Sequence, residues 1–111
     1  MTEFFDTLEK RLSDRSLLIQ AAYVGGEWLK EAQSGETFEV FNPSTGDRIA
    51  RLPDLGAGET SLAIDKAYDV QKDWAAKTGK DRAGILRKWY DLMVANADDL
   101  AAILCAEMGK P

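Results

Sequence analysis

The chain has 111 residues, which suits one domain of ordinary size or a part of a larger one. Its 14 basic and 19 acidic residues give a net charge of −5, and the acidic residues are scattered instead of gathered into a tail. This distribution argues against nucleic-acid binding, because phosphate contacts need clustered Lys and Arg side chains. The sequence contains no histidine, which excludes Ser-His-Asp, Cys-His and His-metal sites within these residues.

The start of the chain does not resemble a targeting signal. Residues 1–19 carry seven charged side chains, too many for a signal-peptide core, and too many of them are acidic for a transit peptide. No apolar run approaches the roughly 20 residues that a membrane helix needs. A single cysteine, Cys105, excludes an internal disulfide. We therefore expect a cytoplasmic protein that binds neither membranes nor nucleic acids.

The first predicted elements are a helix and a tight hairpin. Phe5, Leu8 and Leu12 are spaced by three and four residues, which predicts an amphipathic helix over residues 2–12. Residues 17–23 are apolar and predicted to be extended. The pair Gly25-Gly26 then separates two strand-like runs, and glycine adopts the positive φ angles of a hairpin turn at little cost.

A second hairpin follows a polar loop around Ser34-Gly35. Residues 37–41 alternate in the manner of a strand, and residues 48–52 resume it before Pro53. The intervening stretch, residues 42–47, is rich in turn-forming residues: proline fixes φ, Asn and Asp bond their own backbone, and glycine has free φ.

From Gly56 the period of the apolar residues changes from two to about 3.6, which predicts three helices. Glu59 in the first turn favours the positive end of the first helix dipole. Thr78 and Asp81 resemble a capping box for the second helix, and Asn96 is predicted to cap the third, with Asp99 in its first turn. The apolar faces are Ala63, Ala67, Val70 and Trp74; Ile85, Leu86, Trp89, Leu92 and Met93; and Leu100, Ile103, Leu104 and Met108.

The predicted fold class is therefore α+β, with an N-terminal helix, two β-hairpins and three helices. These elements present more apolar surface than 111 residues can cover on themselves, and the chain's three tryptophans each have a large area to bury. We expect the helices to pack against further protein.

The residues offer no catalytic constellation of their own. Cys105 lies in an apolar helix without a base nearby, so we interpret it as an inert, buried hydrophobe. Asp98 and Asp99 are adjacent on a helix and do not face each other, which favours solvated helix-start charges over an acid–base pair. The segment Gly56-Ala57-Gly58 lacks the third glycine of a dinucleotide fingerprint and is interpreted as a turn and N-cap. Gly109-Lys110 lacks the rest of a phosphate loop.

Four segments occur in order along the chain. They are Tyr23-Val24-Gly25-Gly26-Glu27-Trp28, Phe38-Glu39-Val40-Phe41-Asn42-Pro43-Ser44-Thr45-Gly46, Arg82-Ala83-Gly84-Ile85-Leu86-Arg87-Lys88-Trp89 and Glu107-Met108-Gly109-Lys110-Pro111. Together they resemble the amino-terminal part of the aldehyde dehydrogenase superfamily, continuously from about residue 18 to residue 111. Within it, Asp91-Leu92-Met93, Asp98-Asp99-Leu100-Ala101 and the closing Glu-x-Gly-Lys-Pro look most like bacterial succinate semialdehyde dehydrogenases. Glutarate semialdehyde dehydrogenases are not separable in this region.

The resemblance implies an enzyme that oxidises an aldehyde to a carboxylic acid with NAD or NADP. In the family a cysteine thiolate attacks the aldehyde and a glutamate activates the water that hydrolyses the thioester. Both residues, and the elements that bind the dinucleotide, lie downstream of the region matched here. The resemblance therefore implies no catalytic and no cofactor-binding residue in this chain, and no activity or bound cofactor for these 111 residues alone.

The same resemblance divides the chain and suggests partners. Residues 1–17 form a helix and lead-in, and residues 18–111 match an incomplete amino-terminal portion of the cofactor-binding domain. In the family this portion is the outer layer of a Rossmann-like α/β domain. The complete enzyme is implied to be a homo-oligomer, a dimer or a tetramer, with a small aldehyde as substrate.

One family site reaches this segment. Some members bind Na⁺ or K⁺ through backbone oxygens before the Asn-Pro turn and an acidic side chain two residues before the Gly-Lys pair. Those positions match Val40, Phe41 and Glu107, and ligation by oxygen alone suits a hard cation. Several members have Asp at the position of Glu107, so solvation or a salt bridge for this side chain remains the alternative.

Two further interpretations stay open. Another aldehyde dehydrogenase branch, acting on betaine aldehyde or an aromatic aldehyde, is one of them, because the residues that line the substrate tunnel belong to later sequence. The other is a scaffold or interaction module that uses the apolar helix faces to bind a partner.

Overall fold

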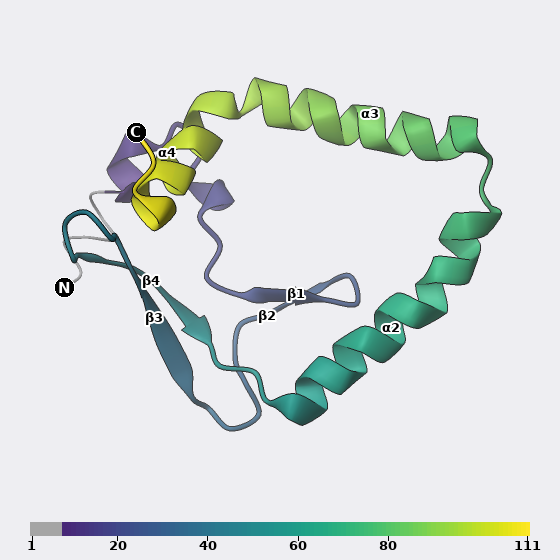
Figure 1. Ribbon diagram of the computed structural model, residues 1–111, viewed down its shortest axis with the longest axis horizontal. Coiled ribbons are helices and arrows are strands. Elements are labelled where there is room, and N and C mark those ends of the chain that lie inside the picture. Colours follow the sequence, from purple (N-terminus) through teal and green to yellow (C-terminus); the bar gives the residue numbers. More distant parts are fainter. Residues whose placement is uncertain (1–7) are drawn as a thin grey trace.

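A computed structural model of the chain describes residues 8–111, and the elements follow one another as the sequence predicts (Figure 1). Residues 8–11 are helical, so the helix predicted over residues 2–12 ends one residue early, and its part before residue 8 lies outside the described residues. The further elements are η1 (Arg15–Leu17), β1 (Ala22–Val24), β2 (Glu27–Leu29), β3 (Thr37–Phe41), β4 (Arg48–Pro53), α2 (Ala57–Ala76), α3 (Gly79–Ala95) and α4 (Ala97–Met108). The α+β class, with two hairpins and three helices, is confirmed.

The first hairpin turns at the two glycines. Val24 pairs with Glu27, so that Gly25 and Gly26 are the whole loop, with φ angles of 59° and 84°. Positive φ at both loop residues is the turn geometry whose twist matches paired strands, and the predicted hairpin is confirmed. The extended run predicted from Leu17 is too long, because residues 15–17 form a 3-10 turn capped by Asp14.

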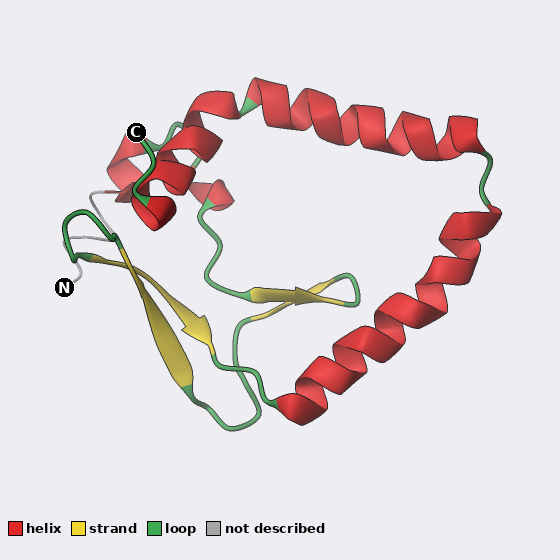
Figure 2. Ribbon diagram, viewed as in Figure 1, coloured by secondary structure: helices red, strands yellow, loops and turns green. Residues whose placement is uncertain are grey.

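The second hairpin is a separate two-stranded antiparallel sheet (Figure 2). Its register is interrupted between Val40 and Phe41: Val40 pairs with Ala50 and Phe41 with Arg48, which leaves Ile49 as the extra residue of a β-bulge. Pro53 is the last residue of β4, where a proline costs the sheet least.

Two of the three predicted helix caps are confirmed, and the third is wrong. At α2, the Glu59 carboxylate accepts a hydrogen bond from the Gly56 N–H, and at α3 the Thr78 hydroxyl accepts one from the Asp81 N–H. Asn96 occupies the position before α4, but its side-chain amide donates to the Leu92 carbonyl instead of capping α4. Only this one residue separates the two helices, and its amide is within reach of the last turn of α3.

The core is small and lies at one end of the molecule. Leu8, Ile49 and Ala106 form it, with Leu18 and Val40 packed against them, whereas α2 and α3 contain no buried residue. In Figure 1, α2 leads away from the hairpins to the far side of the molecule, and α3 returns from there to α4. The shape positions the β3–β4 turn and the end of α4 beside the core.

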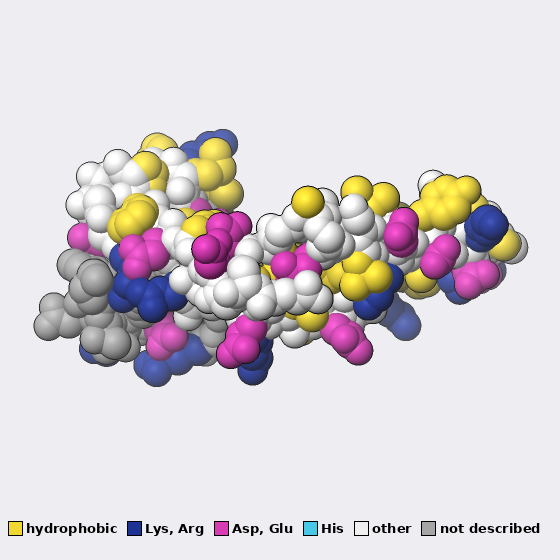
Figure 3. All heavy atoms as spheres, turned by 90° about the horizontal axis from the view of Figure 1, so that it is seen from below, with side chains coloured by type: hydrophobic (Ala, Val, Ile, Leu, Met, Phe, Trp, Pro, Cys, Tyr) yellow, Lys and Arg dark blue, Asp and Glu magenta, His cyan; other side chains and the backbone are white. Residues whose placement is uncertain are grey.

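The apolar surface predicted to need a partner is exposed. The radius of gyration is 16.8 Å, against about 13 Å for a compact domain of this length. The accessible surface is 8422 Å², against roughly 6,100 Å² for a compact monomer of this mass. Trp28, Trp74 and Trp89 are 50%, 37% and 62% exposed. Figure 3 shows hydrophobic side chains exposed among charged ones along the extended part of the molecule. In residues 8–111 no helix is long and apolar enough to cross a membrane.

Candidate functional site

The end of α4 lies against the turn between β3 and β4. The helix ends at Gly109, whose φ of 72° is left-handed and whose N–H donates to the Cys105 carbonyl at 2.9 Å. A Cβ atom added to Gly109 would stand 3.0 Å from Cγ of Pro43. Glycine is therefore required here twice, by the backbone conformation and by the close approach of the proline ring.

The turn itself is held by Asn42. Its side-chain oxygen accepts hydrogen bonds from the N–H groups of Ser44 (2.9 Å) and Thr45 (3.3 Å), and its own N–H donates to the Asp47 carbonyl at 2.7 Å. All of these hydrogen bonds lie within six residues, so the turn could be predicted from the local sequence. They keep Pro43 in place beneath Gly109.

The three predicted cation ligands come from the two segments that meet at this junction. Val40 and Phe41 end β3, immediately before Asn42, and Glu107 lies in the last turn of α4, two residues before Gly109. Val40 is half-buried, whereas Phe41 and Glu107 are exposed. The β-bulge falls at Val40 and Phe41, and a bulge interrupts the hydrogen-bond ladder locally.

The donor set at this junction suits a hard cation only. Backbone carbonyls and one carboxylate supply oxygen alone, which Na⁺ and K⁺ accept and softer metals do not favour. In the part of the chain that the structure describes, no three side chains of His, Cys, Asp or Glu gather into a metal-binding group. A cation held here would therefore depend on the backbone oxygens of Val40 and Phe41.

Asp99 is not the solvated helix-start charge that its sequence predicts. It is 7% exposed, and its two carboxylate oxygens accept hydrogen bonds from the backbone N–H groups of Ser13 and Asp14, each at 2.9 Å. Its neighbour Asp98 remains exposed. The prediction was wrong for Asp99 because its partners lie at the other end of the sequence, where no local pattern indicates them.

A charged cluster on the second hairpin was not predicted at all. The Glu39 carboxylate on β3 accepts from the side chains of Arg48 and Arg51 on β4, the latter at 3.0 Å. The hydrogen bonds from Arg48 and then Arg51 lower the pKa of Glu39 below its ordinary value. Glu39 and Arg51 are direct cross-strand partners only because of the bulge; counting outward from the turn would have paired Glu39 with Ala50, so no pattern in the sequence indicated this ion pair.

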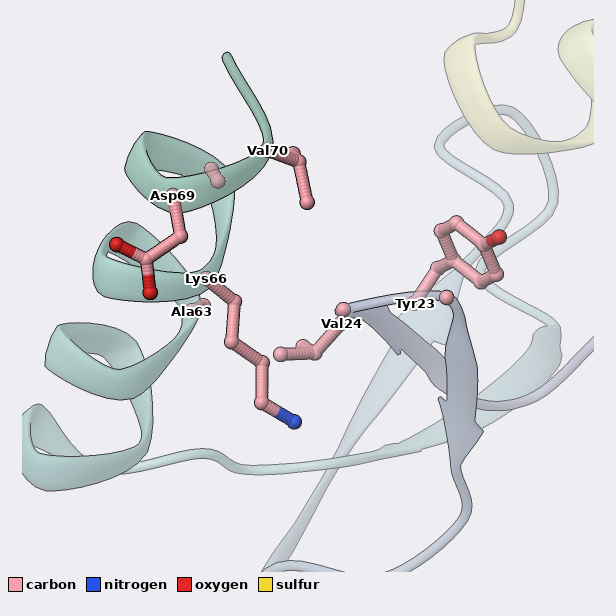
Figure 4. A pocket seen from close by; sticks show the side chains of 9 residues that line it. Tyr23, Val24, Ala63, Lys66, Asp69 and Val70 are labelled. Atoms are coloured by element: carbon pink, nitrogen blue, oxygen red, sulfur yellow. The ribbon is translucent and has the colours of Figure 1, made fainter. Parts of the chain in front are cut away.

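A cleft with a volume of about 630 Å³ lies between the first hairpin and α2. Lys66 extends from α2 toward the hairpin, and Val24 points back toward the helix (Figure 4). The Lys66 side chain passes so close to Gly25 that a Cβ there would overlap its Cδ atom. Both charged residues of the lining, Lys66 and Asp69, come from α2. The cleft lacks the polar groups converging from several elements that mark a ligand site.

The remaining sequence candidates show no catalytic arrangement. Cys105 is half-buried in α4, so its prediction as a buried hydrophobe is only partly met. Gly56 is the N-cap of α2, as predicted, and its N–H donates a hydrogen bond to the Glu59 carboxylate. The other oxygen of Glu59 accepts from the Gln33 N–H at 3.2 Å, which joins the loop before β3 to the start of α2.

Comparison with known proteins gives one consistent result. Residues 28–111 match the aldehyde dehydrogenase family. A 3-sulfolactaldehyde dehydrogenase of Pseudomonas putida is 51% identical over 90% of the chain, and the NADP-dependent succinate-semialdehyde dehydrogenase of Escherichia coli K12 is 46% identical over 91%. A crystal structure of succinate-semialdehyde dehydrogenase from Burkholderia pseudomallei superposes with a TM-score of 0.80 at 50% identity, over 86% of the chain.

The chain spans about one fifth of the length of these proteins. The matches cover 20% of the P. putida protein, 21% of the E. coli protein and 20% of the B. pseudomallei chain. The similarity thus concerns one portion of a larger enzyme.

Proposed function

The chain belongs to the aldehyde dehydrogenase family, and from this membership we propose that it is the amino-terminal portion of the cofactor-binding domain of an NAD(P)-dependent dehydrogenase for succinate semialdehyde. The observation that carries the proposal is the identity of 46% over 91% of the chain with an NADP-dependent succinate-semialdehyde dehydrogenase. The 3-sulfolactaldehyde dehydrogenase, 51% identical over 90%, supports the family and an anionic aldehyde substrate. Residues 18–111 form this portion, and residues 1–17 lead into it.

The reaction converts an aldehyde and water into a carboxylate, with one hydride passing to the nicotinamide ring and two protons released. The bound dinucleotide supplies the hydride acceptor. The described residues hold no nucleophile with a neighbouring base, so their part in the reaction is to support the domain. They support it by packing the exposed apolar faces of α2 and α3 against the rest of the domain. Covering solvent-exposed indole and aliphatic side chains lowers the free energy of the folded protein.

The substrate class follows from the relatives' substrates. Succinate semialdehyde carries a carboxylate at the end opposite its aldehyde, and 3-sulfolactaldehyde carries a sulfonate there. Both are short aldehydes with a distal anion. We take succinate semialdehyde as the first candidate, with glutarate semialdehyde as its longer homologue, since it has the same two end groups.

A monovalent cation is part of the proposal. Na⁺ or K⁺ would be held by the backbone oxygens of Val40 and Phe41 and by the Glu107 carboxylate. The contact between Pro43 and Gly109 supports this assignment, because it brings the two contributing segments together. The cation would neutralise Glu107 and strengthen the junction of α4 with the β3–β4 turn.

The test is an assay of the full-length product of the gene that encodes this chain. We expect NADH or NADPH to form with succinate semialdehyde, with a kcat/KM at least about tenfold above that for betaine aldehyde and benzaldehyde, a difference of about 1.4 kcal/mol in transition-state binding. The kcat/KM values for glutarate semialdehyde and 3-sulfolactaldehyde measure how strongly the enzyme discriminates by chain length and by the kind of distal anion. A preference for betaine aldehyde would overturn the substrate assignment, and failure to oxidise any aldehyde would overturn the enzymatic one.

A further inference from the structure

The buried carboxylate of Asp99 joins the two ends of the described chain. Ser13 and Asp14 are 86 and 85 residues away in sequence, and each donates its N–H to a different oxygen of Asp99. Hydrogen bonds from N–H groups to an ionised carboxylate are about twice as strong as those between neutral groups. In Figure 1 the first described residues, drawn in purple, lie beside α4.

The segment that Asp99 binds also makes apolar contacts at its other end. Leu8 is 3% exposed and packs with Ile49 of β4 and Ala106 of α4. Leu8 and Arg11 also border a small cleft with Asn42 and Asp47 of the β3–β4 turn. Residues 8–14, which we call the strap, therefore lie across the junction of α4, β4 and this turn.

The two ends of the strap are held by different forces. Leu8 is held by burial, which depends on the area covered and not on direction. Ser13 and Asp14 are held by hydrogen bonds with a defined geometry, which fixes where the segment leaves α4 before η1 begins. Asp14 connects the strap to η1. Its N–H is bound by Asp99, and its own carboxylate accepts a hydrogen bond from the Ser16 N–H and caps η1.

We propose that Asp99 is the anchor of the strap, and that removing its charge releases residues 12–14 while α4 and the second hairpin stay folded. Residues 12–14 are then the detachable end of the strap, whereas Leu8 stays packed against Ile49 and Ala106. Its release would expose Leu12, which is 6% exposed in the closed arrangement. This inference does not depend on the proposed enzymatic activity.

The matched pair of variants is Asp99→Asn and Asp98→Asn. Both residues lie in the first turn of α4, so both substitutions remove one favourable charge from the positive end of the helix dipole. Only Asp99 accepts from the strap. Asparagine has the same size as aspartate but presents an N–H₂ group to one of the two donors, which leaves that donor without an acceptor.

Hydrogen exchange measured by NMR at the Ser13 and Asp14 amides is the primary readout. In the unsubstituted protein we expect both amides to be protected, although neither belongs to a helix or strand. In Asp99→Asn we expect at least about a tenfold loss of protection, because hydrogen bonds to charged groups contribute that much. In Asp98→Asn we expect no change.

Trypsin gives a second readout, because Arg11 and Arg15 flank the bound amides. Asp99→Asn should speed cleavage after these two residues and leave cleavage after Arg48 and Arg51 unchanged. Unprotected Ser13 and Asp14 amides in the unsubstituted protein would overturn the proposal. So would equal exchange in the two variants, or faster cleavage at all four arginines, which would mean that Asp99 supports the whole fold and not the strap.

Discussion

Gly109, at the end of α4, approaches Pro43 in the β3–β4 turn 66 positions earlier so closely that a Cβ on Gly109 would stand 3.0 Å from the proline Cγ, and the ring would have to move by a few tenths of an ångström. The contact joins the last helix to the second hairpin and brings Glu107 to the same end of the molecule as Val40 and Phe41.

The contact predicts opposite effects for two glycine substitutions. Gly109→Ala should lower the free energy of unfolding by about 1–2 kcal/mol, because alanine is strained at positive φ and its Cβ would meet Pro43. Gly84→Ala, within α3 and with open space around it, should raise helix stability by about 0.5–1 kcal/mol. Urea unfolding followed by circular dichroism measures both, and a stabilising Gly109→Ala would contradict the observed contact.

The Glu39 cluster predicts a pH dependence. The pKa of Glu39 is lowered in the folded state by Arg48 and Arg51, so the carboxylate contributes stability above its unfolded value of about 4.5 and loses that contribution as pH falls through the lower folded pKa. Glu39→Gln should therefore destabilise the protein at neutral pH, and its difference from the unsubstituted protein should shrink below about pH 4.5.

The control for this effect is Glu36→Gln, one residue before β3. Unfolding midpoints of the three proteins, measured in steps from pH 7 to pH 3, separate the two positions. A Glu39→Gln difference that stays constant across this range, or that Glu36→Gln reproduces, would assign the effect to general charge and not to the cluster.

The exposed helix faces predict that large substitutions there are tolerated. Trp89→Gln on α3 should change the free energy of unfolding by no more than about 0.5 kcal/mol, because the indole is 62% exposed. Ile49→Ala should cost about 2–5 kcal/mol, because Ile49 is 4% exposed and belongs to the core.

The Trp89→Gln variant also tests what the exposed faces do. We expect a dye specific for apolar surface, such as anilinonaphthalene sulfonate, to bind the 111-residue chain and to bind Trp89→Gln less. A broad thermal transition accompanied by dye binding is expected of a portion that lacks its packing partner. A sharp, cooperative transition without dye binding would favour the independent interaction module.

The cation assignment predicts a specific salt effect. KCl or NaCl should raise the free energy of unfolding more than choline chloride at the same ionic strength, by about 1.4 kcal/mol when the cation concentration is ten times its Kd. Glu107→Gln should remove the difference between the salts, and Glu107→Asp should keep it. If all salts act alike on the three proteins, Glu107 is solvated and the assignment is wrong.

The local elements of the fold were predictable because their causes lie within a few residues. Gly25-Gly26 specifies its turn through the φ angles that it permits, Asn42 closes its turn through its own side chain, and Thr78 caps α3 through an N–H three residues later. The cation ligands could be named only through the family resemblance, since backbone oxygens leave no mark in a sequence.

The sequence by itself determined the order of elements, their turns and the family, because periodicity and turn chemistry are short-range properties. The tertiary structure decided the roles of Asp99 and Glu39. Asp99 takes its partners from Ser13 and Asp14, at a separation of more than 80 residues. Whether a carboxylate at a helix start is solvated or buried depends on which distant backbone reaches it, and only the folded chain brings that backbone there.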